Sequence, residues 1–115
     1  MAIKILHNPR CSKSREVLEF LNKKGINLEV ILYLENPLLA EEVKNILKML
    51  KISAREVMRK KEPEYKEQDL DNPNLTEEKL IQAIVKTPKL LERPIVINGN
   101  KAVIARPSEN ILQIL

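Results

Sequence analysis

Residues 93–107 read RPIVINGNKAVIARP, and this stretch decides which fold the chain can adopt. Two runs rich in β-branched residues flank the turn signal NGN (98–100). This pattern is typical of two antiparallel strands joined by a short loop. The C-terminal part of the chain is therefore predicted to form a β-hairpin, and the other strands must pair with it.

Two arginines bracket this hairpin. Arg93 precedes the first strand and Arg106 follows the second. A turn centred between Gly99 and Asn100 places them directly opposite each other, whereas a turn centred on Asn98-Gly99 displaces them by two residues. In both cases the guanidinium groups lie at the open end of the hairpin, where like charges are unfavourable unless a negative group lies between them. A bound anion would meet this need; two solvated arginines at strand ends are the alternative.

The N-terminal part shows a strand, a helix and a second strand. Residues 2–6, AIKIL, have the pattern of a short buried strand. Residues 11–24 carry apolar residues at helical spacing, and Gly25 is a natural helix stop. Residues 28–34, LEVILYL, are rich in branched residues and predict the next strand. This is a βαβ unit, with two parallel strands and a right-handed crossover.

The middle of the chain is predicted to be helical. Residues 39–50 place their apolar residues on one helical face. The segment ISAREVMRK (52–60) predicts a further short helix with Ser53 as its cap. Residues 62–75 are polar and contain two prolines, so we expect a loop there.

Two more helices complete the prediction. Thr76 is the expected cap of a helix that ends before Pro88. After the hairpin, SENILQIL (108–115) predicts a short terminal helix with Ser108 as a candidate cap. The residues expected to pack inward are Ile111, Leu112 and Leu115. The order of elements is thus β-α-β, helices, β-β-α, an α/β arrangement.

Composition limits the possible functions. The chain has 115 residues, 43% of them hydrophobic, which suits one domain, and it contains neither an apolar run of membrane-spanning length nor a signal-peptide pattern. A single cysteine excludes an internal disulfide and an all-cysteine zinc site, so we expect a cytoplasmic protein. Twenty basic residues are interspersed with 16 acidic ones, and aromatic residues make up 3% of the chain. This argues against nucleic-acid binding.

The stretch HNPRCSKSRE (7–16) holds that cysteine, Cys11, between a strand and a helix start. Free N–H groups at a helix start favour negative charge, lower the pKa of a thiol and can also hold an oxyanion. Arg10, Lys13 and Arg15 add positive charge nearby. Cys11 is therefore a candidate nucleophile; a small buried residue at a strand–helix junction is the alternative.

Two neighbours of Cys11 are candidate supporting residues. His7 either helps to deprotonate the thiol or hydrogen-bonds the loop backbone. Ser14 stands where a Cys-x-x-Cys motif has its second cysteine. No internal disulfide can form there, so a thiol from outside must resolve any covalent intermediate, as glutathione or a protein thiol could.

Taken together, the chain resembles the glutaredoxin-coupled arsenate reductase family over nearly its full length. The stretches that carry the resemblance are HNPRCSKSRE (7–16), YLENP (33–37), VMRKKEPEY (57–65), RPIVI (93–97) and ARPSE (105–109). The resemblance implies a single thioredoxin-like domain over residues 1–115, with a mixed four-stranded sheet and a helical insertion at about residues 39–88. It also implies that the peptide between Arg93 and Pro94 is cis and faces the cysteine loop.

The resemblance further implies an arsenate reductase that serves in arsenic detoxification. Cys11 attacks arsenate with loss of water, glutathione attacks the adduct and reduces the arsenic, and glutaredoxin frees the cysteine. Arg59, Arg93 and Arg106 correspond to the arginines that bind the oxyanion, and Arg59 is selected by the resemblance alone. Arginine suits this task because its planar fork stays charged and binds two oxygens. We expect no tightly bound cofactor and no metal, with glutathione as the reductant.

Two other functions are compatible with the sequence. A glutathione-dependent thiol reductase would keep the thiol chemistry and act on another substrate. A redox-linked regulator that binds RNA polymerase would share the fold, although such regulators typically use a Cys-x-x-Cys switch that Ser14 removes.

Overall fold

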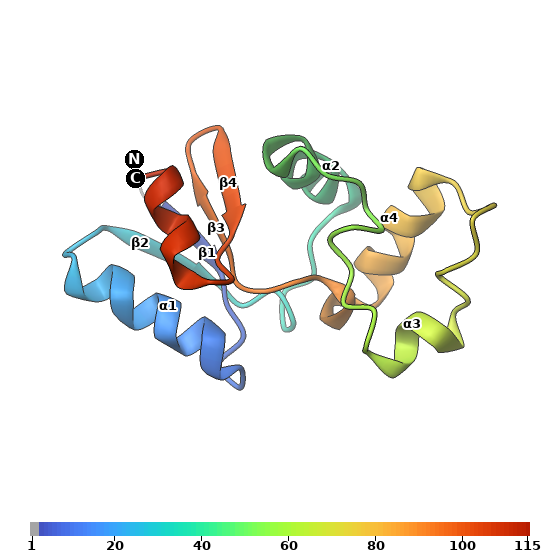
Figure 1. The fold of residues 1–115 in the computed structure, drawn as a ribbon, viewed down its shortest axis with the longest axis horizontal. Coiled ribbons are helices and arrows are strands. Elements are labelled where there is room, and N and C mark those ends of the chain that lie inside the picture. Colours follow the sequence, from blue (N-terminus) through green and yellow to red (C-terminus); the bar gives the residue numbers. More distant parts are fainter. Residues whose placement is uncertain (1–2) are drawn as a thin grey trace. The chain divides into compact units, whose positions relative to one another are not determined.

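The computed structural model of the chain describes residues 3–115 (Figure 1). Ala2, which belongs to the predicted first strand, lies outside the described residues. The elements in order are β1 (Ile3–Leu6), α1 (Ser12–Lys23), β2 (Leu28–Ile31), α2 (Ala40–Leu50), α3 (Pro63–Glu67), α4 (Glu77–Lys86), η1 (Pro88–Leu90), β3 (Ile95–Asn98), β4 (Lys101–Ile104) and η2 (Ser108–Gln113). They belong to two compact units, one formed by Met1–Asn36 with Arg93–Leu115 and the other by Pro37–Glu92.

The first unit contains a mixed four-stranded sheet with the order β2-β1-β3-β4. β1 and β2 are parallel, as the predicted βαβ unit requires. β3 is antiparallel to both β1 and β4. A β-α-β segment and a β-β-helix segment that share one sheet make the thioredoxin-like α/β fold, so the predicted fold class is confirmed.

The turn of the hairpin is centred between Gly99 and Asn100, the first of the two registers considered. Asn98 pairs with Lys101, and Gly99 has a φ of 62°, which glycine adopts without strain. If the same register is continued by two residues beyond the Ile95–Ile104 pair, Arg93 lies opposite Arg106. The backbone remains paired at this end, since the N–H of Ala105 donates to the carbonyl of Pro94 at 2.9 Å.

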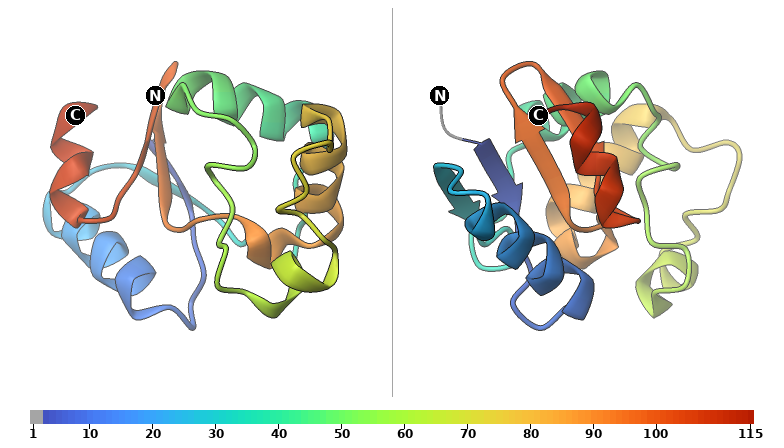
Figure 2. Two further views of the ribbon diagram at one scale, coloured as in Figure 1. Left: turned by 45° about the vertical axis from the view of Figure 1, so that its right-hand side comes forward. Right: turned by 60° about the vertical axis from the view of Figure 1, so that its left-hand side comes forward.

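The core of this unit lies between the sheet and two helices, α1 and η2, which cover the same face (Figure 2). Cross-strand neighbours Ile5, Val96 and Val103 point to this face because they share one register line. The buried members of the cluster are Ile3, Ile5, Val17, Leu21, Val96, Val103, Ala105, Ile111 and Ile114. Gly25, with a φ of 68°, follows α1 at the predicted stop.

The second unit packs α2 against α4. Thr76 caps α4 as predicted, since its hydroxyl accepts a hydrogen bond from the N–H of Lys79 at 3.2 Å. The helix ends at Lys86, before Pro88. The buried residues of the two helices are Val43, Ile46 and Leu47 of α2 and Leu80, Ile81, Ala83 and Ile84 of α4.

The predicted helix over residues 52–60 is wrong. Ser53 and Glu56 form the reciprocal contacts of a helix start, at 3.0 and 3.3 Å. However, the chain turns only once and then extends, because Met58 forms a β-bridge with Leu91. Pairing with a distant segment thus overrides the local helical signal.

The loop expected over residues 62–75 contains a short helix, α3. Pro63 stands at its first position, where the missing N–H is tolerated. The strand predicted over residues 28–34 is too long. β2 ends at Ile31 because Leu32 starts a turn, its carbonyl accepting hydrogen bonds from Glu35 and Asn36.

The terminal helix η2 is a 3-10 helix, and Pro107 rather than Ser108 occupies its cap position. Because 3-10 helices repeat every three residues, Ile111 and Ile114 share the buried face. The prediction was wrong for the two leucines, since the exposed side chains are Leu112 (58%) and Leu115 (48%).

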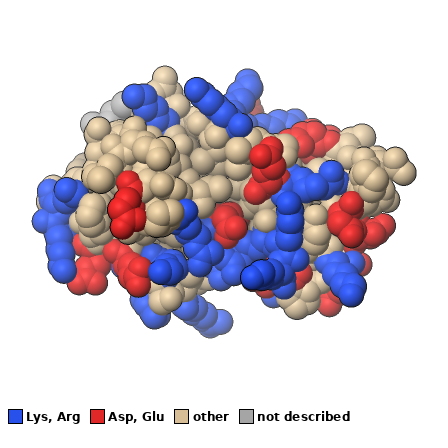
Figure 3. Space-filling view, in the orientation of Figure 1, with Lys and Arg blue, Asp and Glu red and all other residues tan. Residues whose placement is uncertain are grey.

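Basic and acidic side chains are interspersed on the face shown in Figure 3, as the sequence pattern predicts for solvated helix surfaces. Within residues 3–115, no helix combines the length and the apolar character needed to cross a bilayer.

Two leucine variants test the core. Leu21→Ala should lower the free energy of unfolding by about 3 kcal/mol, because it leaves a cavity at a fully buried position. Leu112→Ala, at an exposed position, should change it by less than about 0.5 kcal/mol. Urea unfolding followed by circular dichroism measures both, and equal losses would contradict the described packing of α1 and η2.

Candidate functional site

The segment between β1 and α1 forms a tightly bonded loop. The N–H of His7 still pairs with the carbonyl of Ile31 at 2.9 Å, in continuation of the parallel strands. The chain then turns at Asn8, whose side-chain oxygen accepts the N–H of Arg10 at 3.0 Å and whose carbonyl accepts the N–H of Cys11 at 3.0 Å. This turn places Cys11 at the N-cap position of α1.

Ser14 connects the loop to the helix. Its side chain is fully buried, and its hydroxyl oxygen lies 2.7 Å from Nδ1 of His7 and accepts the N–H of Asn8 at 3.1 Å. Since Asn8 supplies a donor, the hydroxyl proton of Ser14 is available for Nδ1 when the imidazole is neutral. The predicted supporting residues His7 and Ser14 are thus in direct contact.

The environment of His7 favours its neutral form. Burial lowers the pKa of His7, and the positive charge of Arg15 lowers it further. A neutral imidazole whose Nδ1 accepts the Ser14 proton acts as a fixed anchor for the loop. This geometry supports the role in loop structure, one of the two roles considered for His7.

The environment of Cys11 favours the thiolate. Burial of the partly exposed thiol raises its pKa, but hydrogen bonding from the Ser14 N–H, the Arg93 guanidinium and the Lys13 N–H lowers it more strongly, as does the charge of Arg93. In the described part of the chain, no side-chain hydrogen bond caps α1, so its first N–H groups remain available to the sulfur. The net result is a pKa below the ordinary value of a cysteine.

Arg93 is the charged partner of this thiolate. It precedes Pro94, which is buried, and the peptide between them is cis, as the resemblance implies. The Nε atom of Arg93 is buried without a hydrogen-bond partner among the described residues. A buried N–H donor beside a reactive sulfur suits a negatively charged ligand.

Arg106 lines a pocket in the same unit. The pocket measures about 390 Å³, and its lining also includes Lys13 of the first turn of α1 and two acidic residues, Glu16 and Glu109. The peptide between Arg106 and Pro107 is also cis, which nothing in the sequence analysis anticipated. Arg106 itself is exposed and lies opposite Arg93 in the hairpin register.

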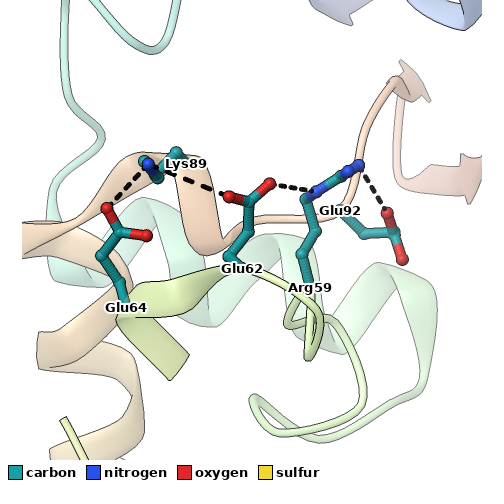
Figure 4. A network of polar contacts seen from close by, with 5 residues as sticks. All are labelled: Arg59, Glu62, Glu64, Lys89 and Glu92. Carbon is teal, nitrogen blue, oxygen red and sulfur yellow. Dashed lines mark hydrogen bonds and ion pairs between the residues drawn. The ribbon is translucent and has the colours of Figure 1, made fainter. Parts of the chain in front are cut away.

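Arg59 belongs to the second unit and is held by two carboxylates (Figure 4). Its Nε lies 3.1 Å from Glu62 and its Nη1 lies 3.3 Å from Glu92. Neither glutamate was among the predicted site residues. Glu62 is three residues from Arg59 in the sequence, so this contact could have been inferred from the spacing. Glu92 is 33 residues away, and no sequence pattern indicates its contact with Arg59.

Asn8 and the main-chain N–H groups of Lys13 and Ser14 were also missed as individual contributors. Asn8 carries a signal, because Asn before Pro at the end of a strand is typical of a side-chain-stabilised turn. Over residues 3–115 no group of three or more His, Cys, Asp or Glu side chains is arranged to hold a metal ion.

Comparisons with known proteins identify the family and the fold. The model of the ArsC family matches residues 6–114. The chain is 54% identical to the uncharacterized protein YfgD of Escherichia coli K12, over 98% of this chain and 96% of that one. It is 52% identical to an arsenate reductase of Neisseria meningitidis serogroup B, over 98% and 97%. A solved arsenate reductase from Vibrio cholerae superimposes with a TM-score of 0.97 at 44% identity, covering 100% of this chain and 98% of that one.

The effect of the Arg93 charge on the pKa of Cys11 should be measurable by alkylation of the thiol. We expect the rate of Cys11 alkylation by iodoacetamide to reach its plateau at a lower pH than for a free cysteine, whose pKa is about 8.5. Arg93→Gln should move the midpoint of this pH profile upward by about one pH unit. Arg15→Gln is the matched control, and an equal shift in both variants would contradict the specific role of Arg93.

The lowered pKa of His7 should make the free energy of unfolding depend on pH. Its pKa is lowered in the folded state, so below the ordinary value of about 6.5 the unfolded chain binds more protons. The free energy of unfolding should therefore fall as the pH decreases from 7 to about 5.5. Urea unfolding at several pH values measures this, and His7→Gln should flatten the slope. A wild-type slope of opposite sign would show that His7 is preferentially protonated in the fold.

Proposed function

The chain belongs to the ArsC family, and from this premise we propose that it is an arsenate reductase in which the Cys11 thiolate is the nucleophile. The observation that carries the proposal is the convergence of main-chain N–H groups and the Arg93 guanidinium on one sulfur. The same groups favour a thiolate and an oxyanion, which are the two reactants of the first step.

The first step is a substitution at arsenic. The Cys11 sulfur attacks pentavalent arsenic, an As–O bond breaks, and the departing oxygen takes a proton and leaves as water. The product is a covalent Cys11–arsenic adduct. Because two anions repel, this step requires positive charge, and Arg93 supplies it at the sulfur.

The second part of the reaction reduces the arsenic. Cys11 is the single cysteine of the chain, so the reducing thiols come from other molecules. The family resemblance implies that these are glutathione and glutaredoxin. One thiol attacks the arsenic adduct, an As–O bond breaks, and the oxygen takes a proton and leaves as water. A second thiol then attacks the sulfur of the new As–S bond, and this bond breaks. Arsenic takes two electrons and becomes trivalent, and the two thiols leave as a disulfide, so atoms and electrons balance. The adduct then hydrolyses and returns the Cys11 thiol.

Arg59 and Arg106 are assigned to oxyanion binding together with Arg93. For Arg106, its place opposite Arg93 and its pocket shared with Lys13 support the assignment. For Arg59, the support is its match to the motif VMRKKEPEY (57–65). Planar guanidinium groups bind two oxygens of a tetrahedral anion at once, which fixes its orientation for attack.

A coupled assay tests the function. Arsenate, glutathione, glutaredoxin and glutathione reductase are combined with the protein, and oxidation of NADPH is followed. Cys11→Ser should abolish the arsenate-dependent rate because the nucleophile is lost. Arg106→Gln should lower kcat/KM by about tenfold through weaker binding of the anion.

Lys23→Ala, at an exposed position on the last turn of α1, is the control and should retain the wild-type rate. A folded wild-type protein without arsenate-dependent NADPH oxidation would refute the substrate assignment. Turnover of a glutathionylated peptide by the same preparation would then support a thiol reductase instead.

A further inference from the structure

We propose that Asn8 is a positioning residue: its neutral side-chain oxygen fixes the turn that presents the Cys11 sulfur to the first main-chain N–H groups of α1. The inference deepens the proposed function and rests on it, because this sulfur is the nucleophile of the proposed reaction. Asn8 acts through the backbone of Arg10 and Cys11, not through contact with the substrate. All three residues lie in the first unit.

The turn between β1 and α1 is closed by two hydrogen bonds to Asn8. Its side-chain oxygen accepts the N–H of Arg10 at 3.0 Å, and its carbonyl accepts the N–H of Cys11 at 3.0 Å. Asn is favoured at the first position of such a turn and proline at the second, where Pro9 stands. An Asn side chain that accepts from the residue two positions on imitates a backbone turn. The two N–H groups that follow Pro9 therefore converge on one residue.

Burial makes this arrangement persistent. Asn8 is 8% exposed, and its own N–H donates to the hydroxyl of the fully buried Ser14 at 3.1 Å. Water therefore competes little for the side-chain oxygen of Asn8, and removing that oxygen leaves the N–H of Arg10 without this acceptor. Asn8 is thus bonded at its N–H, its side-chain oxygen and its carbonyl oxygen.

The backbone of Cys11 is consequently held from both sides. Its N–H is bonded to Asn8, and its carbonyl accepts the N–H of Arg15 at 3.0 Å, as at the start of a helix. Between these bonds Cys11 has a φ of −96° and a ψ of 121°, the extended conformation of an N-cap residue. An N-cap side chain in this conformation faces the N–H groups of the second and third helical residues, here Lys13 and Ser14. These are the N–H groups whose hydrogen bonds lower the pKa of the thiol.

The neutral amide suits this position better than a carboxylate would. Aspartate can accept the same hydrogen bond and is also common in turns of this kind. Its negative charge would stand three residues before Cys11, where it would disfavour the thiolate and repel an incoming anion. The carboxamide of Asn8 supplies the acceptor without the charge.

The pH profile of Cys11 alkylation by iodoacetamide tests the inference in the full chain. Asn8→Ala removes the side-chain acceptor and keeps every main-chain group, so the midpoint should rise by about one pH unit. Asn8→Ser keeps a neutral but weaker acceptor and should give a smaller rise. Asn8→Asp keeps the turn but adds a charge, so its midpoint should rise by more than that of Asn8→Ser. Arg93, the cation that hydrogen-bonds the thiol, is present in all three variants.

Asn72 provides a matched control. Its side-chain oxygen accepts the N–H of Asn74 at 2.9 Å, with the same two-residue spacing, and it belongs to the other unit. Asn72→Ala removes the same atom from the same kind of turn and should leave the midpoint unchanged. Circular dichroism shows which variants are folded. If Asn8→Ala does not fold, Asn8→Ser and Asn8→Asp carry the test, because both keep an acceptor.

The outcomes separate the positioning role from the proposed function. An unchanged midpoint in folded Asn8→Ala, or an equal rise in Asn72→Ala, overturns the role of Asn8. A wild-type midpoint in Asn8→Asp overturns the requirement for a neutral acceptor. Alkylation needs no arsenate, so the predicted shifts in a protein that does not reduce arsenate would refute the proposed function and leave the control of the thiol by Asn8 in place.

Discussion

The site depends on the way Ser14 joins the end of β1 to the start of α1. Its hydroxyl binds the imidazole of His7 and the N–H of Asn8, and its own main-chain N–H acts on the Cys11 sulfur. A single buried residue thereby sets both the path of the loop and the ionisation of the thiol. Burial lowers the pKa of His7, and the charge of Arg15 lowers it further, so the environment favours the neutral imidazole that this connection uses.

Arg93 and Arg59 present positive charge in two different ways. Arg93 hydrogen-bonds the thiol, and its buried Nε has no hydrogen-bond partner among the described residues, so this N–H can serve a ligand. Arg59 is paired with two carboxylates, Glu62 and Glu92, so its net contribution to the local potential is small.

Features that depend on contacts between residues close in the sequence were predicted correctly. Features that depend on contacts between distant segments could not be predicted from the local sequence pattern. The Thr76 cap is predictable because donor and acceptor are three residues apart. The failed helix over residues 52–60 was decided by pairing with a segment more than thirty residues away. The same limit applies to the site: Cys11 follows from its place before a helix, Arg59 only from a family resemblance, and Glu92 from neither, because its contact is tertiary.

Serine at position 14 has a chemical consequence that links the fold to the reaction. A cysteine there could resolve an adduct on Cys11, but a thiol is a weak donor and acceptor and would hold His7 and Asn8 poorly. The buried N–H of Asn8 would then lose its partner, at a cost of about 1–3 kcal/mol. The Ser14 hydroxyl thus holds the loop in the geometry that favours the Cys11 thiolate. Because residue 14 is a serine and not a cysteine, it cannot supply a thiol that would reduce an adduct on Cys11. In the proposed reaction the electrons come from an external thiol, which has to reach the Cys11 sulfur. The partial exposure of Cys11 at the helix start permits this access.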